Sequence, residues 1–191
     1  MNKTLTLSCL LAALAGCSSN SPTTASPMSS SPGTNSSFTQ DSLPASIQVP
    51  AGNKVTLQTV GTGEIAYQCR EKQGAAGNYE WVFLGPNAIL TNRAGGKVGT
   101  YYGPPATWES TDGSKLTATQ VAVAPAGTGN IPYQLVKANP AMGQGAMSGI
   151  TYIQRVATRG GVAPAATCDA SSTGRSSTVK YQADYIFWSA S

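Results

Sequence analysis

The sequence predicts a single all-β domain at residues 44–191, a sandwich or barrel of about eight or nine short, mainly antiparallel strands. Two observations lead to this prediction. Hydrophobic residues in this part of the chain recur with a period of two, the period of a strand, rather than the 3.6-residue period of a helix. Clusters of Gly, Asp, Asn and Pro separate the alternating runs, as turns separate the strands of a sandwich or barrel.

The candidate strands follow one another along the chain with short connections. The first two cover residues 54–60 and 64–70, and Gly61-Thr62-Gly63 predicts a turn between them. A β-rich run at 79–84 is expected to end at Gly85-Pro86. The remaining candidate strands lie at 87–91, 97–102, 115–124, 131–138, 149–158 and 177–188.

Two of these elements give sharper expectations. Asp112-Gly113 predicts a type I′ hairpin turn, because both of its central positions tolerate positive φ. In the last strand, every second residue is apolar or aromatic, which predicts that this row faces the core. The row consists of Val179, Tyr181, Ala183, Tyr185 and Phe187.

The first residues are typical of an export signal. Lys3 supplies a positive charge, and the apolar run at 4–13 is shorter than the ~20 residues that cross a bilayer as a helix. Leu14-Ala15-Gly16-Cys17 resembles the lipobox of bacterial lipoproteins, whose cysteine receives lipid before signal peptidase II cuts in front of it. We therefore expect a signal peptide at 1–16 and acyl chains such as palmitate on Cys17. The residue after the lipidated cysteine is Ser18, and a serine at this position resembles the sorting signal of outer-membrane lipoproteins. We therefore expect the domain at the outer membrane, facing the periplasm or the cell surface.

The residues after the lipidated cysteine predict a disordered tether. Residues 17–43 are rich in Ser, Thr and Pro, with only scattered hydrophobic residues. Such a composition buries too little apolar surface to offset the entropy of ordering. The folded domain is therefore expected to begin at residue 44.

The cysteines predict one disulfide. Of the four in the chain, Cys9 leaves with the signal peptide and Cys17 carries lipid. The remaining pair, Cys69 and Cys168, is expected to be bonded in the oxidising compartment that an exported domain enters.

The chain contains no histidine, which excludes several kinds of active site. A Ser-His-Asp triad, a Cys-His dyad and histidine-containing zinc sites all require this residue. We expect neither a metal nor a cofactor. Residues 61–66 match the G-x-G-x-x-A spacing of a dinucleotide site, but strand alternation continues after them, whereas that site needs a helix.

The charged residues are dispersed. The chain has 12 basic and 8 acidic residues with no block of one sign, so nucleic acid is not an expected partner. Arg155 and Arg159 are expected to form surface ion pairs with Glu71, Glu80 or Asp184.

Aromatic and acidic residues gather between residues 101 and 114. Tyr101, Tyr102 and Trp108 form a candidate ligand patch, since aromatic side chains beside carboxylates are typical of carbohydrate sites. The alternative is a structural loop with Asp112 as a turn former. If the domain hydrolyses polysaccharide, Glu109 is the candidate acid, with Glu64 or Asp112 as its partner.

A series of short segments covers nearly all of residues 44–191: Val49–Gly52, Ile65–Cys69, Trp81–Ala88, Gly103-Pro104, Trp108-Glu109, Asp112–Ser114, Ile131–Tyr133, Ile153–Val156, Thr158–Pro164, Cys168 and Tyr181–Phe187. Together these segments resemble an uncharacterised family, domain of unknown function 3455. The resemblance implies a secreted or surface domain without an assigned reaction, and it supports pairing of Cys69 with Cys168. Relatives are expected to carry a histidine before Gly103-Pro104, where this chain has Tyr101-Tyr102.

These observations favour a non-catalytic domain, attached to a membrane through lipid on Cys17, that binds a glycan or an envelope or surface protein. The alternative is a carboxylate-dependent polysaccharide hydrolase.

Overall fold

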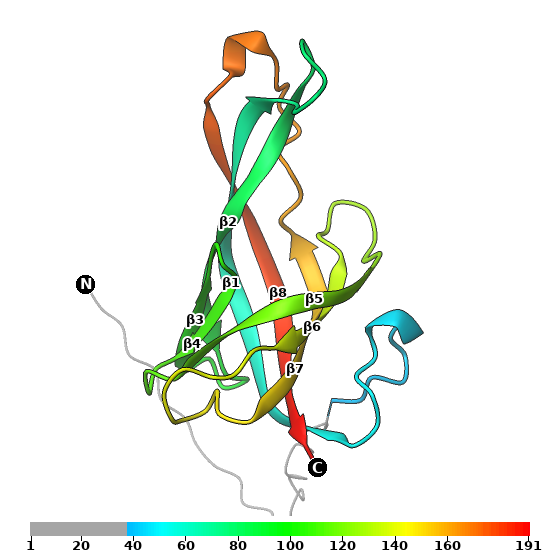
Figure 1. Ribbon diagram of the computed structural model, residues 1–191, viewed down its shortest axis with the longest axis vertical. Coiled ribbons are helices and arrows are strands. Elements are labelled where there is room, and N and C mark those ends of the chain that lie inside the picture. The colour runs from blue at the N-terminus through cyan, green and yellow to red at the C-terminus, as the bar shows by residue number, and fades with distance from the viewer. Residues whose placement is uncertain (1–37) are drawn as a thin grey trace, which may run out of the picture. The chain divides into compact units, whose positions relative to one another are not determined.

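Eight antiparallel strands close into one barrel, in which each strand pairs with the next and β8 pairs with β1 (Figure 1). This computed structural model describes residues 38–191. The all-β prediction is confirmed, and of its two alternatives the barrel is the one formed. The strands are β1 (Asn53–Glu71), β2 (Tyr79–Thr91), β3 (Lys97–Tyr102), β4 (Thr107–Ser110), β5 (Lys115–Ala124), β6 (Tyr133–Ala138), β7 (Ile150–Gly160) and β8 (Ser176–Ala190), with short 3₁₀ helices η1 (Ala45–Ile47) and η2 (Ala170–Ser172).

None of the described helices has the length and apolar character needed to cross a membrane.

The predicted turn at Gly61-Thr62-Gly63 is wrong, because β1 runs through it without a break. These glycines allow close packing between strands instead. A Cβ on Gly61 would lie 2.5 Å from Cε2 of Tyr185, and a Cβ on Gly63 would lie 2.1 Å from the carbonyl oxygen of Asn87. The two predicted strands therefore merge into one strand of 19 residues.

The predicted strand end at Gly85-Pro86 is also wrong, since β2 continues to Thr91. The register between β1 and β2 shifts at Ala66, which pairs with Gly85. Such a bulge is a position at which a strand tolerates proline. Gly85 has a φ of 153°, and a Cβ there would lie 2.1 Å from the carbonyl oxygen of Gly103.

Asp112-Gly113 does form the turn between β4 and β5, but not a type I′ turn. Gly113 has a φ of 86°, whereas Asp112 is not among the described residues with positive φ. The N–H of Gly113 donates to the carbonyl of Ser110, and the N–H of Ser110 donates to the carbonyl of Ser114. This is a longer connection in which glycine alone takes the left-handed conformation.

The interior of the barrel is filled by side chains. Residues from all eight strands meet in one buried cluster, which identifies its face as the inner one. Tyr181, Ala183, Tyr185 and Phe187 of β8 belong to it, as the alternation predicts, and Val179 packs against it. The other strands contribute, among others, Ile65, Ala88, Tyr101, Trp108, Leu116, Val136 and Ile153.

A second buried cluster lies on the outer face, beneath the N-terminal residues of the described chain. Residues 38–43, expected in the tether, pack there. Phe38 meets Trp188 edge to face, with ring centroids 6.2 Å apart. The side chain of Gln40 exchanges two hydrogen bonds with the backbone of Val49, of 2.8 and 2.7 Å. The packed domain thus begins before residue 44; the predicted signal peptide, Cys17 and residues 18–37 lie outside the described residues.

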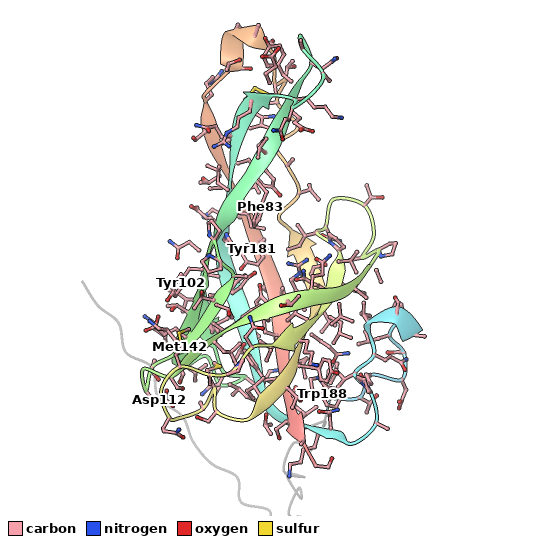
Figure 2. All side chains as sticks on the ribbon, in the orientation of Figure 1. Phe83, Tyr102, Asp112, Met142, Tyr181 and Trp188 are labelled. Carbon is pink, nitrogen blue, oxygen red and sulfur yellow. A yellow bond between two sulfur atoms is a disulfide. The ribbon has the colours of Figure 1, made fainter. Side chains whose placement is uncertain are left out.

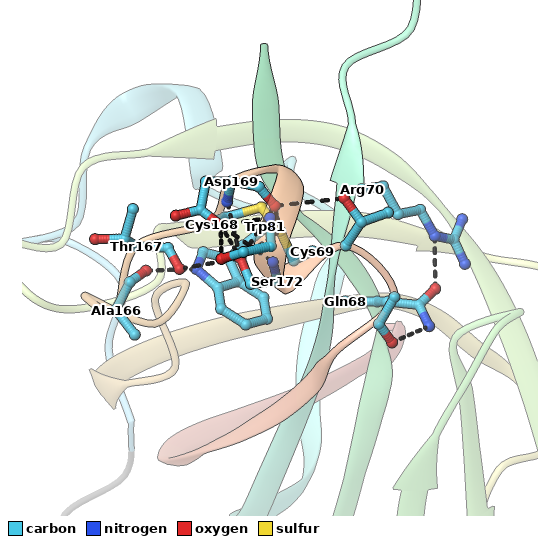
Figure 3. Close-up of a disulfide and its surroundings, with 12 residues drawn as sticks. Gln68, Cys69, Arg70, Trp81, Ala166, Thr167, Cys168, Asp169 and Ser172 are labelled. Atoms are coloured by element: carbon cyan, nitrogen blue, oxygen red, sulfur yellow. Dashed lines mark hydrogen bonds between the residues drawn. A yellow bond between two sulfur atoms is a disulfide. The ribbon is translucent and has the colours of Figure 1, made fainter. Parts of the chain in front are cut away.

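The Cys69–Cys168 disulfide is present and joins the end of β1 to the segment before η2 (Figure 3). Its Cα atoms are 5.5 Å apart, and its sequence separation is 99 residues. Beside it, Nε1 of Trp81 donates to the carbonyl of Ala166 at 2.8 Å. The β1–β2 hairpin is thereby fastened to the chain that leads into β8.

Candidate functional site

The predicted catalytic carboxylates Glu64 and Glu109 are not brought together. Glu64 is exposed on β1 and lies opposite Lys180 of β8. Glu109 is on β4, where its Oε2 accepts a 2.7 Å hydrogen bond from the hydroxyl of Tyr102. β2 and β3 lie between β1 and β4, so three strand spacings of about 4.8 Å separate the two residues along the sheet, roughly 14 Å. Glycosidases place their carboxyl groups about 5–9.5 Å apart.

Asp112 holds two loops together. Its carboxylate accepts hydrogen bonds from the hydroxyl of Ser114 at 2.6 Å, the N–H of Ser114 at 2.9 Å and the N–H of Ala146 at 2.7 Å. These bonds, the Ser114 hydroxyl first, lower the pKa of Asp112 to about 2. A carboxyl group with that pKa is ionised near neutral pH, and both of its oxygens already accept hydrogen bonds from the loops. Asp112 therefore joins the β4–β5 turn to the loop before β7 (Figure 2).

The predicted aromatic patch is divided between two faces. Tyr101 and Trp108 are 5% and 2% exposed and stack in the inner cluster, with ring centroids 4.6 Å apart. Tyr102 is 37% exposed. Successive residues of a strand point to opposite faces, so neighbours in sequence cannot share a surface here. Tyr101 and Trp108 are core residues, and they do not form an exposed patch with Tyr102.

Arg155, expected in a surface ion pair, instead lies on the inner face. It stands on β7 directly opposite Gln134 of β6 and Tyr185 of β8. Tyr185 belongs to the inner cluster, and residues that pair across strands share a face. Arg155 is half-buried there. Asp184, one of its expected partners, bonds to Arg93 at 2.8 Å.

One edge of the Arg155 guanidinium group is hydrogen-bonded to the protein backbone. Its Nε and Nη2 donate to the carbonyl oxygen of Pro132 at 3.2 and 2.9 Å. A guanidinium has five N–H donors. Both N–H groups of Nη1 and one of Nη2 therefore have no hydrogen-bond partner among residues 38–191.

No carboxylate neutralises Arg155 within the part of the chain that the structure describes. All eight Asp and Glu residues lie between positions 41 and 184. The ion pair recorded for residues 38–191 is the one between Arg93 and Asp184. A half-buried guanidinium without a counter-ion attracts an anion from outside the protein.

The charge of Arg155 acts on four buried tyrosines of the inner cluster: Tyr67, Tyr101, Tyr181 and Tyr185. Burial raises the pKa of all four phenols, and the positive charge of Arg155 acts on each in the opposite direction. The hydroxyls of Tyr181 and Tyr185 lie 3.3 Å apart, and that of Tyr67 donates to the carbonyl of Gly161 at 2.7 Å. Because these phenols stay neutral, they do not cancel the charge of Arg155.

Solvent-exposed apolar and amide groups adjoin Arg155. Val123 of β5 pairs with Gln134, which places it on the same face, and it is 46% exposed. The Nε2 of Gln134 donates to Oε1 of Gln120 at 2.7 Å. We call Gln120, Val123, Gln134 and Arg155 the Arg155 face.

The fold and this site define a closed eight-stranded barrel domain with a filled interior and a half-buried arginine side chain on its inner face. The chain belongs to the family described as Protein of unknown function (DUF3455), whose model matches residues 50–189. The predicted resemblance to this family is thus confirmed. No curated protein and no solved structure matches the chain significantly.

Proposed function

We propose that this chain is a non-catalytic domain of the bacterial envelope, anchored to the outer membrane by lipid on Cys17, that binds an envelope glycan or surface component at the Arg155 face. The observation that carries the binding role is the guanidinium of Arg155, in which three of the five N–H groups have no hydrogen-bond partner and no carboxylate pairs with the charge among residues 38–191. The hydrolase alternative has no support, because Glu64 lies three strands from Glu109 and the carboxylate of Asp112 is engaged by loop hydrogen bonds.

The anchor rests on the lipobox at residues 14–17. Replacing its cysteine, Cys17→Ser, is expected to abolish incorporation of radiolabelled palmitate and to move the protein from the membrane fraction to the soluble fraction. Cys9→Ser is the matched control, because it also removes a cysteine but leaves the lipidation position intact. Labelling of the Cys17→Ser protein, or equal loss of label in both variants, contradicts the anchor.

The binding role predicts that a charge on the Arg155 face disrupts ligand binding. The chain carrying Cys17→Ser would be mixed separately with purified peptidoglycan, lipopolysaccharide and envelope polysaccharide, and the bound fraction measured. Val123→Glu is expected to weaken binding at least about tenfold, the effect of losing one important contact.

Ile89→Glu supplies the control for this experiment. Ile89 is a similarly exposed residue, at 50%, but it pairs with Thr62 and Thr100 on the outer face. Both variants should unfold at nearly the same temperature as the parent, since both side chains are half in solvent. If no component binds the parent, or if both variants bind equally well, this function is wrong.

A further inference from the structure

The Arg155 face also indicates the chemical class of its ligand. We infer that this face binds an acidic polysaccharide, in which a sugar carboxylate pairs with Arg155 and sugar hydroxyls bond to the amides of Gln120 and Gln134. This inference rests on the proposed binding role and makes it more specific.

The free edge of the guanidinium suits a carboxylate. The bonds from Nε and Nη2 to Pro132 occupy the side edge of the group and fix its plane. The opposite end, with one N–H each from Nη1 and Nη2, remains open. Two parallel N–H groups of this kind bind both oxygens of a carboxylate, a geometry that a lysine ammonium cannot reproduce.

The charge around Arg155 also favours an anion over a neutral sugar. Every acidic side chain of the protein lies in the described residues, and none of them pairs with Arg155. Glu64, Glu109 and Asp184 are held on other parts of the barrel, opposite Lys180, against Tyr102 and against Arg93 respectively. An incoming carboxylate therefore meets no nearby negative charge on this face.

The amides beside Arg155 suit hydroxyl groups. In the bond between Gln134 and Gln120, the first amide acts as donor and the second as acceptor. Each amide has two donor N–H groups and an acceptor oxygen, so most of this capacity is left for a ligand. Exposed Val123 offers a small apolar contact for the carbon face of a sugar ring.

The filled interior argues against an anionic lipid. Trp108, Tyr185 and Phe187 are all at most 2% exposed and occupy the inner cluster. An eight-stranded barrel encloses about the space that its own side chains fill. An acyl chain therefore has no interior space to enter. A polysaccharide needs only the solvent-accessible part of the face, where Arg155 is half-buried and Val123 is 46% exposed.

The test uses the chain carrying Cys17→Ser and three acidic polymers, polygalacturonate, alginate and hyaluronate, with neutral dextran for comparison. Isothermal titration should show binding to at least one acidic polymer and none to dextran. Arg155→Gln should weaken that binding at least about tenfold, and Arg155→Lys should recover only part of it. Arg159→Gln is the matched control, because Arg159 is an exposed residue of the same strand outside the Arg155 face.

Gln134→Ala tests the same face with a milder substitution, so the inference stays testable if the arginine variants fold poorly. It removes one amide from the face and is expected to weaken binding about three- to tenfold, while the melting temperature stays near that of the parent. Binding to none of the acidic polymers, equal binding to dextran, or unchanged binding by Arg155→Gln overturns the inference. Arg155-dependent binding to laurate or to anionic phospholipid vesicles, without binding to the polymers, overturns the glycan class.

These outcomes separate the inference from the proposed function. If Val123→Glu abolishes binding to an envelope component and Arg155→Gln does not, the acidic ligand is wrong and the binding role stands. If the parent chain binds no envelope component and no polymer, both are wrong.

Discussion

Replacing both Cys69 and Cys168 with alanine is expected to lower the free energy of unfolding by up to about 4–5 kcal/mol. The disulfide closes a loop with a sequence separation of 99 residues, so its loss greatly enlarges the ensemble of the unfolded chain. Alanine suits this test because Cys69 is fully buried and a small apolar side chain adds no unpaired polar group. Urea unfolding of the double variant, followed by tryptophan fluorescence, measures the change.

The native structure around the missing bond should persist in this variant. The N–H of Cys69 still donates to the carbonyl of Arg175, and the N–H of Gly174 to the carbonyl of Cys69. The wild-type protein in dithiothreitol is the matched control, and it should unfold at nearly the same urea concentration as the double variant. An unchanged midpoint in the double variant would show that the bond contributes little to stability.

The period-two pattern predicted the fold class because alternation is a local property of a strand. It also predicted the inward row of β8, which includes Tyr181 and Tyr185. The roles of Gly61 and Gly63 are not local. Glycine serves a turn and a close contact equally well, and here the contacts are with Tyr185 and Asn87, which are distant in sequence. The sequence therefore predicted every strand except β4, which was not among the candidates, but it did not predict which runs join into one strand.

The Arg155 face was not predicted from the sequence for a related reason. Arg155 lies between Gln154 and Val156, both of which are buried on the outer face, so polarity around it gives no signal of direction. Its surroundings come from the register of β6 and β8 against β7. The placement of Tyr101 and Tyr102, by contrast, is a local property. Alternation along the strand alone predicts that these neighbours lie on different faces.

Trp108→Ala is expected to lower the free energy of unfolding by about 3–5 kcal/mol, the usual range for a buried aromatic residue. Trp108 is 2% exposed, stacks on Tyr101 and meets Tyr185 edge to face, with ring centroids 6.0 Å apart. Alanine would leave a cavity at the centre of the inner cluster. Urea unfolding measures the loss, with Tyr102→Ala as a control on the adjacent strand that should cost less than about 1 kcal/mol.

Trp108→Phe separates the packing of the ring from its polar group. The Nε1 of Trp108 is buried without a hydrogen-bond partner among residues 38–191. Phenylalanine removes this unpaired donor, whose burial costs about 1–3 kcal/mol, while it keeps much of the aromatic volume. Trp108→Phe should therefore be considerably more stable than Trp108→Ala. If Trp108 were instead part of an exposed ligand patch, Trp108→Ala would weaken ligand binding and leave the unfolding curve unchanged.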